Sequence, residues 1–267
     1  MKRAYADIPE GQIHYRIEGS GYPVLLLHAA TTSSLEYAKV IQFMSKTYCA
    51  IAMDFMGNGD SDQPPYQYQV EDHARTVVSF MDSLGIEKAN VVGHHCGGKV
   101  ALELAVTCPE RVKKLVLSSI GYQPETGEVI VVNDPVKDLD FTSRVEIKPD
   151  GSHLMEWWRR ASLWGHPLEI VEERALEYHK AGPRGEEIHW AGGTYDPKTK
   201  TKLPLIKCPT LVLSTTHDPW CVFAEAEKRL IPDSQVTIIE NGPIDVNRLW
   251  PKEFAEAILD FLNPSAP

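Results

Sequence analysis

The chain has 267 residues, of which 43% are hydrophobic, 24% charged and 9% aromatic. This composition is typical of a packed globular protein and excludes a disordered, collagen-like or coiled-coil chain. The formal net charge is −10, from 37 Asp and Glu against 27 Lys and Arg. Such a chain repels phosphate backbones, so we expect no nucleic-acid partner.

The longest apolar runs, such as Pro23–Ala30, are much shorter than the roughly 20 residues of a membrane span. The opening residues, MKRAYADIPEGQ, place no apolar stretch behind their two basic residues, so no signal peptide is expected. The five cysteines are widely spaced and form no C-x-x-C pair, which favours a reducing compartment. We therefore expect a cytoplasmic monomer or homodimer with no membrane partner.

Short apolar strands alternate with helical patterns along most of the chain, which predicts an α/β domain around a mainly parallel sheet. A helix is expected over Val70–Leu84, closed by Gly85, and another over Pro251–Phe261. The expected strands are Tyr5–Ile8, Gln12–Ile17, Val24–Leu27, Tyr48–Met53, Asn90–Val92, Lys114–Ser118, Pro209–Ser214 and Gln235–Ile239.

About ninety residues separate the sixth and seventh of these strands, far more than a normal βα connection needs. This stretch begins polar, over Gln123–Asp150, and ends with a second helical pattern over Glu169–Lys180. Between them, one helical face carries Leu154, Trp157, Trp158, Ala161 and Trp164. We interpret residues 121–205 as a lid inserted into a core formed by residues 1–120 and 206–267.

Four motifs follow one another along the chain. Leu25–Ala30 is an apolar strand running into a His-containing loop, Asp54–Asp62 reads D-x-x-G-x-G-x-S-D, Asn90–Lys99 reads NVVGHHCGGK, and Pro209–Trp220 is a strand followed by an Asp-containing loop. Together they resemble the α/β-hydrolase fold family over nearly the whole chain. The resemblance implies a mostly parallel eight-stranded sheet, covered by helices on both faces, with an inserted helical lid.

The family's G-x-S-x-G motif carries its nucleophile at the tip of a sharp strand-to-helix turn. Aligning Gly93 and Gly97 with the two glycines places His95 at the nucleophile position, since the turn allows no side-chain bulk beside it. A shift by one residue would make Cys96 the nucleophile but would put His94 where the first glycine belongs. The aligned register leaves the chain without a nucleophilic serine.

The resemblance implies that Asp218 is the acid that orients the catalytic histidine. That histidine is absent: in the family it lies within G-H-x-x-x-x-E-x-P, and counting back from Pro251 gives Ile244. No histidine follows His217 in the chain. The order nucleophile, acid, histidine cannot be completed, so a Ser-His-Asp esterase is excluded.

The absence of both the nucleophilic serine and the catalytic histidine suggests a rearranged site. The imidazole of His95 is longer than a serine side chain and could fill the room vacated at Ile244, so that one ring nitrogen reaches Asp218. Such a pair is a general base that needs no cofactor, and the amides of Ala30 and Cys96 would form an oxyanion hole beside it. We therefore expect hydrolysis or proton-transfer lyase chemistry at His95.

An aromatic, enclosed pocket would favour a small apolar or aromatic substrate. The expected substrate contacts are His28, Phe55, Trp158, Trp190, Trp220 and Ile244. Two alternatives remain open. One is a catalytically silent ligand-binding protein of the same fold, and the other is a metal site formed by His28, His95, His217 and Asp218.

Overall fold

The computed structural model describes residues 1–121 and 146–263. Its strands are β1 (Lys2–Ile8), β2 (Gly11–Glu18), β3 (Pro23–Leu27), β4 (Cys49–Met53), β5 (Ala89–His94), β6 (Val112–Ser118), β7 (Thr210–Thr215) and β8 (Ser234–Ile239). They form one sheet in the order β1-β2-β4-β3-β5-β6-β7-β8. The pairs β1–β2 and β2–β4 are antiparallel and all the others are parallel. The predicted eight-stranded, mostly parallel sheet is confirmed.

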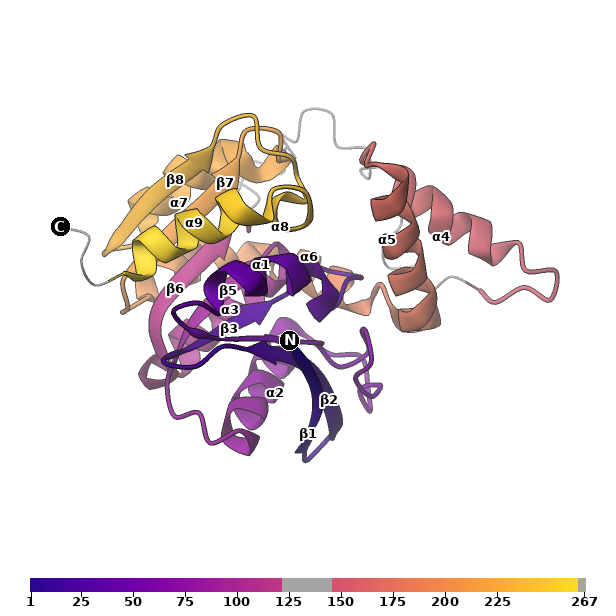
Figure 1. Cartoon of the computed structure of the whole chain (residues 1–267), viewed down its shortest axis with the longest axis horizontal. Coiled ribbons are helices and arrows are strands. Elements are labelled where there is room, and N and C mark those ends of the chain that lie inside the picture. Colours follow the sequence, from indigo (N-terminus) through magenta and orange to yellow (C-terminus); the bar gives the residue numbers. More distant parts are fainter. Residues whose placement is uncertain (122–145, 264–267) are drawn as a thin grey trace.

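Helices cover both faces of this sheet (Figure 1). They are α1 (Ala38–Met44), α2 (Val70–Ser83), α3 (Cys96–Thr107), α4 (His153–Ser162), α5 (Leu168–Ala181), α6 (Glu187–Lys202), α7 (Ala224–Leu230), α8 (Val246–Leu249) and α9 (Pro251–Leu262). Helices α1 and α9 cover one face, where Tyr37 and Phe254 are fully buried. Helices α2 and α3 cover the other, burying Phe80 and Leu104.

The residues of the central strands and of helix α2 explain why these elements form where they do. All three leucines of Leu25–Leu27 are buried, as expected for a parallel strand covered on both sides. Helix α2 begins at a capping box in which the Asp72 carboxylate accepts a hydrogen bond from the Gln69 amide at 2.8 Å. Gly85, at φ +67°, follows its end, so the predicted helix and its stop are confirmed.

The described helices between β6 and β7 fall into two groups. Helices α4 and α5 lie side by side, away from the sheet (Figure 1), around a small cluster of Trp157, Ala161, Val171 and Tyr178. Helix α6 packs on α3 instead, and its Tyr195 joins the main core. The helix predicted over Glu169–Lys180 is confirmed as α5, whereas Trp164 lies beyond the end of α4. The predicted polar stretch lies outside the described residues up to residue 145, and the division into core and lid stays a prediction.

Among the residues that the structure describes, no helix is both long enough and apolar enough to cross a membrane.

Candidate active site

A sharp turn joins β5 to α3, with His95 at its tip (φ 47°, ψ −117°). This backbone conformation is rare for a residue with a Cβ atom. A Cβ added to Gly93 would lie 2.3 Å from the Gly97 oxygen, and one added to Gly97 would lie 2.3 Å from the Leu27 oxygen, so both positions require glycine. The geometry supports the register that places His95 at the tip, and it makes Cys96 the first residue of α3.

The Cys96 thiol is buried, and burial raises its pKa to about 11, although Lys99 and a contact from the Ala30 backbone favour the thiolate. The thiol is therefore protonated at neutral pH and is a poor nucleophile. The same contact places the Ala30 backbone beside the Cys96 thiol, and the oxyanion hole expected at these two positions stays a prediction.

The imidazole of His95 contacts the carboxylate that follows β7. Its Nε2–H donates to Asp218 Oδ2 at 2.8 Å, and Asp218 Oδ1 accepts from the Trp220 amide at 2.9 Å. Asp218 is buried, whereas 21% of the His95 side chain is exposed. The His95 Nδ1 atom has no hydrogen-bond partner among the described residues. Because the carboxylate holds the proton on Nε2, the lone pair of Nδ1 is free to accept a proton. The contact expected from the sequence is present.

Two opposing effects set the protonation of His95. Burial alone would lower its pKa, but the charge and hydrogen bond of Asp218 outweigh burial and raise the pKa above the ordinary value of 6.5. The neighbouring His94, whose ring centroid lies 4.2 Å from that of His95, behaves differently. Burial lowers the pKa of His94 to about 3, and its Nδ1 hydrogen-bonds Ser118 Oγ at 3.0 Å. At neutral pH His94 is thus an uncharged support beneath His95.

We expect activity and stability to change in opposite directions with pH. A general base acts as neutral imidazole, so kcat/KM should rise through the raised pKa of His95 and then level off. A folded-state pKa above the unfolded value of 6.5 contributes stability below pH 6.5, and this contribution is lost as pH rises through the folded pKa. Kinetics and urea unfolding across this window measure both. A kinetic midpoint below pH 6.5 would contradict the assignment.

Backbone strain at His95 should be measurable as a difference in the free energy of unfolding between two matched variants. His95→Gly and His95→Ala both remove the imidazole, but only glycine adopts φ +47° without strain. We expect His95→Gly to be more stable than His95→Ala by about 1 kcal/mol in urea unfolding, the reverse of the usual order. Equal stability, or a more stable alanine variant, would show that the turn holds no strain.

Ile244 lies where the resemblance expected the missing histidine. The loops after β7 and β8 are joined by hydrogen bonds from the His217 amide to Gly242 O (3.2 Å) and from Thr215 Oγ1 to Pro243 O (3.0 Å). These bonds hold the buried Ile244 in the loop that adjoins Asp218.

The structure corrects two of the expected substrate contacts. The His28 ring is fully buried, with Nδ1–H donating to Ala29 O at 2.7 Å and Nε2 accepting from the Phe55 amide at 3.0 Å. The Phe55 ring is also fully buried and packs between the rings of His28 and His73. Both side chains support the loops of the site and leave no surface for a substrate.

The three expected tryptophans lie in different surroundings. Trp220 follows Asp218, and its ring packs against Gly121 and lies 5.9 Å from the ammonium group of Lys99. Trp190 is half-buried against the main core. Trp158 lies on α4, and with 38% of its surface exposed it is not part of the α4–α5 cluster. Of the three, Trp220 is the one whose backbone contacts the dyad, through the hydrogen bond of its amide to Asp218, and the roles of Trp158 and Trp190 stay predictions.

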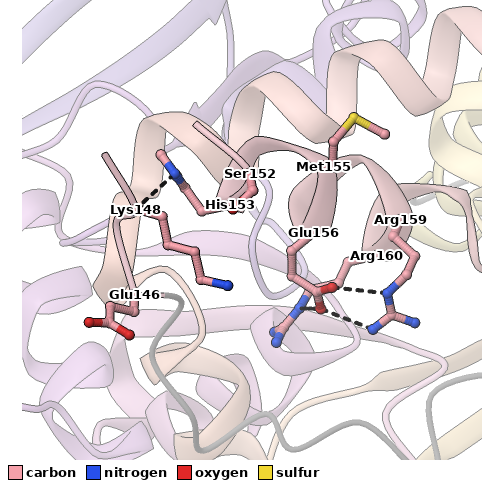
Figure 2. A pocket seen from close by; sticks show the side chains of 8 residues that line it. All are labelled: Glu146, Lys148, Ser152, His153, Met155, Glu156, Arg159 and Arg160. Carbon is pink, nitrogen blue, oxygen red and sulfur yellow. Dashed lines mark hydrogen bonds and ion pairs between the residues drawn. The ribbon is translucent and has the colours of Figure 1, made fainter. Parts of the chain in front are cut away.

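A cavity of about 460 Å³ lies beside α4 (Figure 2). Figure 2 shows that its wall is mainly charged, with Glu156 bridging the guanidinium groups of Arg159 and Arg160. It contains none of the residues expected at the site. This cavity is therefore separate from the His95–Asp218 pair.

The metal site considered from the sequence is not assembled. His28 uses both ring nitrogens inside the protein, and His217 is exposed. Within the described ranges, the group that brings three such side chains within ligand distance is His14, Asp54 and Asp60. The Asp54 oxygens there already accept from His14, from the Ser34 amide (2.6 Å) and from the Asp60 amide (2.8 Å), which is a structural role.

Comparison with known proteins agrees with this geometry. Residues 22–156 match the model of the alpha/beta hydrolase fold family, and the chain belongs to this family. A thermophilic esterase from Thermogutta terrifontis superposes with a TM-score of 0.79 at 24% identity, over 98% of each chain. This likeness shows the fold.

Two curated relatives are similar over part of their length. Haloalkane dehalogenase 2 of Mycobacterium tuberculosis is 34% identical over 119 residues, covering 44% of this chain and 42% of that protein. The soluble epoxide hydrolase of a Corynebacterium species is 35% identical over 106 residues, covering 40% and 37%. The chain thus matches less than half the length of these relatives.

Proposed function

We propose that the chain is an enzyme that acts on a small organic molecule with His95 as a general base. The observation that carries this proposal is the hydrogen bond between His95 Nε2 and the buried Asp218 carboxylate, at the tip of a turn that only glycines at both sides permit. A turn that strains its own backbone to present one side chain is typical of a functional site.

The proposed step begins with Nδ1 of His95. This atom takes a proton from a water molecule or from a carbon of the substrate, and the resulting imidazolium is stabilised by Asp218. Negative charge that develops on a substrate oxygen would be held by the backbone amides of Ala30 and Cys96. No covalent serine intermediate and no cofactor are needed. The reaction class is hydrolysis or proton-transfer lyase chemistry.

The substrate class follows from the neighbours of the dyad. Trp220 contacts Asp218 through its amide, and Ile244 lies in a loop hydrogen-bonded to the loop of Asp218; these apolar neighbours favour a small apolar or aromatic molecule. The names of the two curated relatives refer to haloalkanes and epoxides, which are small organic molecules as well. We place the enzyme in the cytoplasm as a monomer or homodimer.

The test compares the wild-type protein with His95→Gln on a panel of small esters, lactones and epoxides, and on ketones assayed for deuterium exchange. Glutamine can still hydrogen-bond Asp218 but cannot accept a proton. We expect turnover that His95→Gln abolishes and that the control His217→Gln, at the exposed neighbour of Asp218, retains. Turnover that survives in His95→Gln contradicts the proposal. Stabilisation by panel compounds without any turnover would favour the catalytically silent binding protein.

A fluorophosphonate probe gives an independent result. These probes label an activated serine, and the tip of this turn carries His95. We expect no labelling of the wild-type chain by mass spectrometry. Stoichiometric labelling of a serine near the turn, such as Ser118 or Ser119, would overturn the assignment of the site.

A further inference from the structure

A buried arginine on α5 ties this helix to the loop after β8. Only 8% of Arg174 is exposed, and its Nη1–H donates to Asp245 Oδ2 at 2.7 Å. The same carboxylate oxygen lies 3.0 Å from His166 Nε2. Burial would raise the pKa of Asp245, but the charge of Arg174 outweighs it and holds that pKa well below its usual range. The Arg174–Asp245 pair is therefore fully charged at neutral pH.

One edge of the Arg174 guanidinium has no partner. Its Nε–H is completely buried without a hydrogen bond, and Nη2 has no acceptor among the residues that the structure describes. Nε and Nη2 point their hydrogens in the same direction, at the spacing of the two oxygens of a carboxylate. Buried donors in folded proteins are nearly always satisfied, so the orphaned Nε–H of Arg174, beside an Nη2 group without an acceptor, indicates a place for a ligand.

Two other buried arginines of this region show the contrast. Arg248 donates through both Nη1 and Nη2, to Glu173 and Glu177, and leaves only its Nε–H unpaired. Arg160 donates through Nε and Nη1, to Glu156 and Glu186. Neither keeps an intact Nε–Nη2 edge. In the described part of the molecule, the unused edge therefore distinguishes Arg174 from these neighbours.

Arg174 also lies close to the dyad. Its partner Asp245 directly follows Ile244, the residue at the vacated histidine position. Besides burial, Asp245 and Arg174 both shift the pKa of His94, in opposite directions, and Asp245 also acts on His95. Helix α5 also contacts the loop that carries Ala30, because Ser33 Oγ donates to Glu177 Oε1 at 2.6 Å. The two contacts hold α5 against the loops after β3 and β8, which is the basis for a ligand that reaches both Arg174 and His95.

We infer that the substrate carries a carboxylate, which the Nε–Nη2 edge of Arg174 binds through two hydrogen bonds, while the reacting part of the molecule lies against His95. Only the placement of the reacting part against His95 rests on the proposed function; carboxylate binding at Arg174 does not. Carboxylate binding narrows the substrate class to small apolar or aromatic carboxylates. Arg174 is then the specificity-determining residue. A substrate analogue without a carboxylate would leave the charged guanidinium edge unpaired, and this costs binding free energy.

The test measures binding of acetate and benzoate, and of their neutral amides acetamide and benzamide, by calorimetry and thermal shift. We expect at least one carboxylate to bind more tightly than its amide. Arg174→Lys keeps the charge beside Asp245 but loses the paired donors, so carboxylate affinity should fall at least about tenfold. The matched control Arg160→Lys, on the neighbouring helix, should bind like the wild type.

If Arg174→Lys fails to fold, Arg174→Gln combined with Asp245→Asn removes both charges of the pair and should likewise lose carboxylate selectivity. The inference is overturned if neither carboxylate binds better than its amide, or if the Arg174 variants bind both carboxylates like the wild type. His95→Ala should retain carboxylate binding. Selective binding without any turnover by the wild type would therefore contradict the proposed function and leave the Arg174 site standing.

Discussion

Asp218→Asn should lower kcat by about 10³- to 10⁴-fold while the chain still folds. The asparagine oxygen can still accept from the Trp220 amide, as Asp218 Oδ1 does at 2.9 Å. Its NH₂ group would then face His95 Nε2, which would have to accept rather than donate. The proton of His95 would move to Nδ1, the atom that must take a proton from the substrate. The variant therefore selects the wrong tautomer of the base.

The measurement is kcat with a substrate found in the panel, together with the melting temperature. His217→Gln is the matched control, because its imidazole is exposed and directly precedes Asp218. That variant should retain full activity, and a loss of activity there would show that any change in this loop disturbs catalysis. Retention of a tenth or more of kcat in Asp218→Asn would remove Asp218 from the proposed mechanism.

The parts of the fold that sequence predicted well are those governed by local sterics. Gly93 and Gly97 stand on either side of the turn because a Cβ at either position would overlap the backbone. Their spacing therefore identified the turn and its tip. The contact between His95 and Asp218 was also predictable, since both elements end at the same edge of a parallel sheet and the imidazole is long enough to span the gap.

The roles of His28 and Phe55 were not predictable in this way. Both follow strands at the correct edge of the sheet, and an aromatic residue there is expected in a pocket wall. The hydrogen bond from the Phe55 amide to His28 Nε2 forms because the loops after β3 and β4 adjoin. This contact turns the His28 ring inward, and no local pattern in the sequence encodes that direction.

The charged contacts of α5 also escaped sequence reasoning. Arg174 and Asp245 are 71 residues apart, and so are Glu177 and Arg248. A helix with many acidic and basic residues is typical of a solvent-exposed face. Here those residues are buried against loops of the core. The pairing depends on where α5 lies over the sheet, which follows from tertiary packing alone.

His95→Ser combined with Ile244→His should create an esterase site that neither single change creates. His95→Ser supplies a hydroxyl at the strained tip, but no base remains to activate it. Ile244→His supplies a base, but the wild-type imidazole of His95 still occupies Asp218. Only the double variant frees the Asp218 carboxylate for the introduced imidazole and places a serine beside it, in the order that the fold family uses.

The readout is the rate of fluorophosphonate labelling, located by mass spectrometry at position 95. We expect the double variant to be labelled at least about 10³-fold faster than either single variant, because the members of a triad act as a unit. Ile244 is buried, so His95→Ser combined with Ile244→Asn is the control for the polar substitution, and we expect it to be labelled no faster than His95→Ser alone. Labelling of His95→Ser alone at the same rate as the double variant would show that another group already acts as the base. In that case position 244 would not be the vacated histidine position, and the derivation of the dyad from two coupled losses would be wrong.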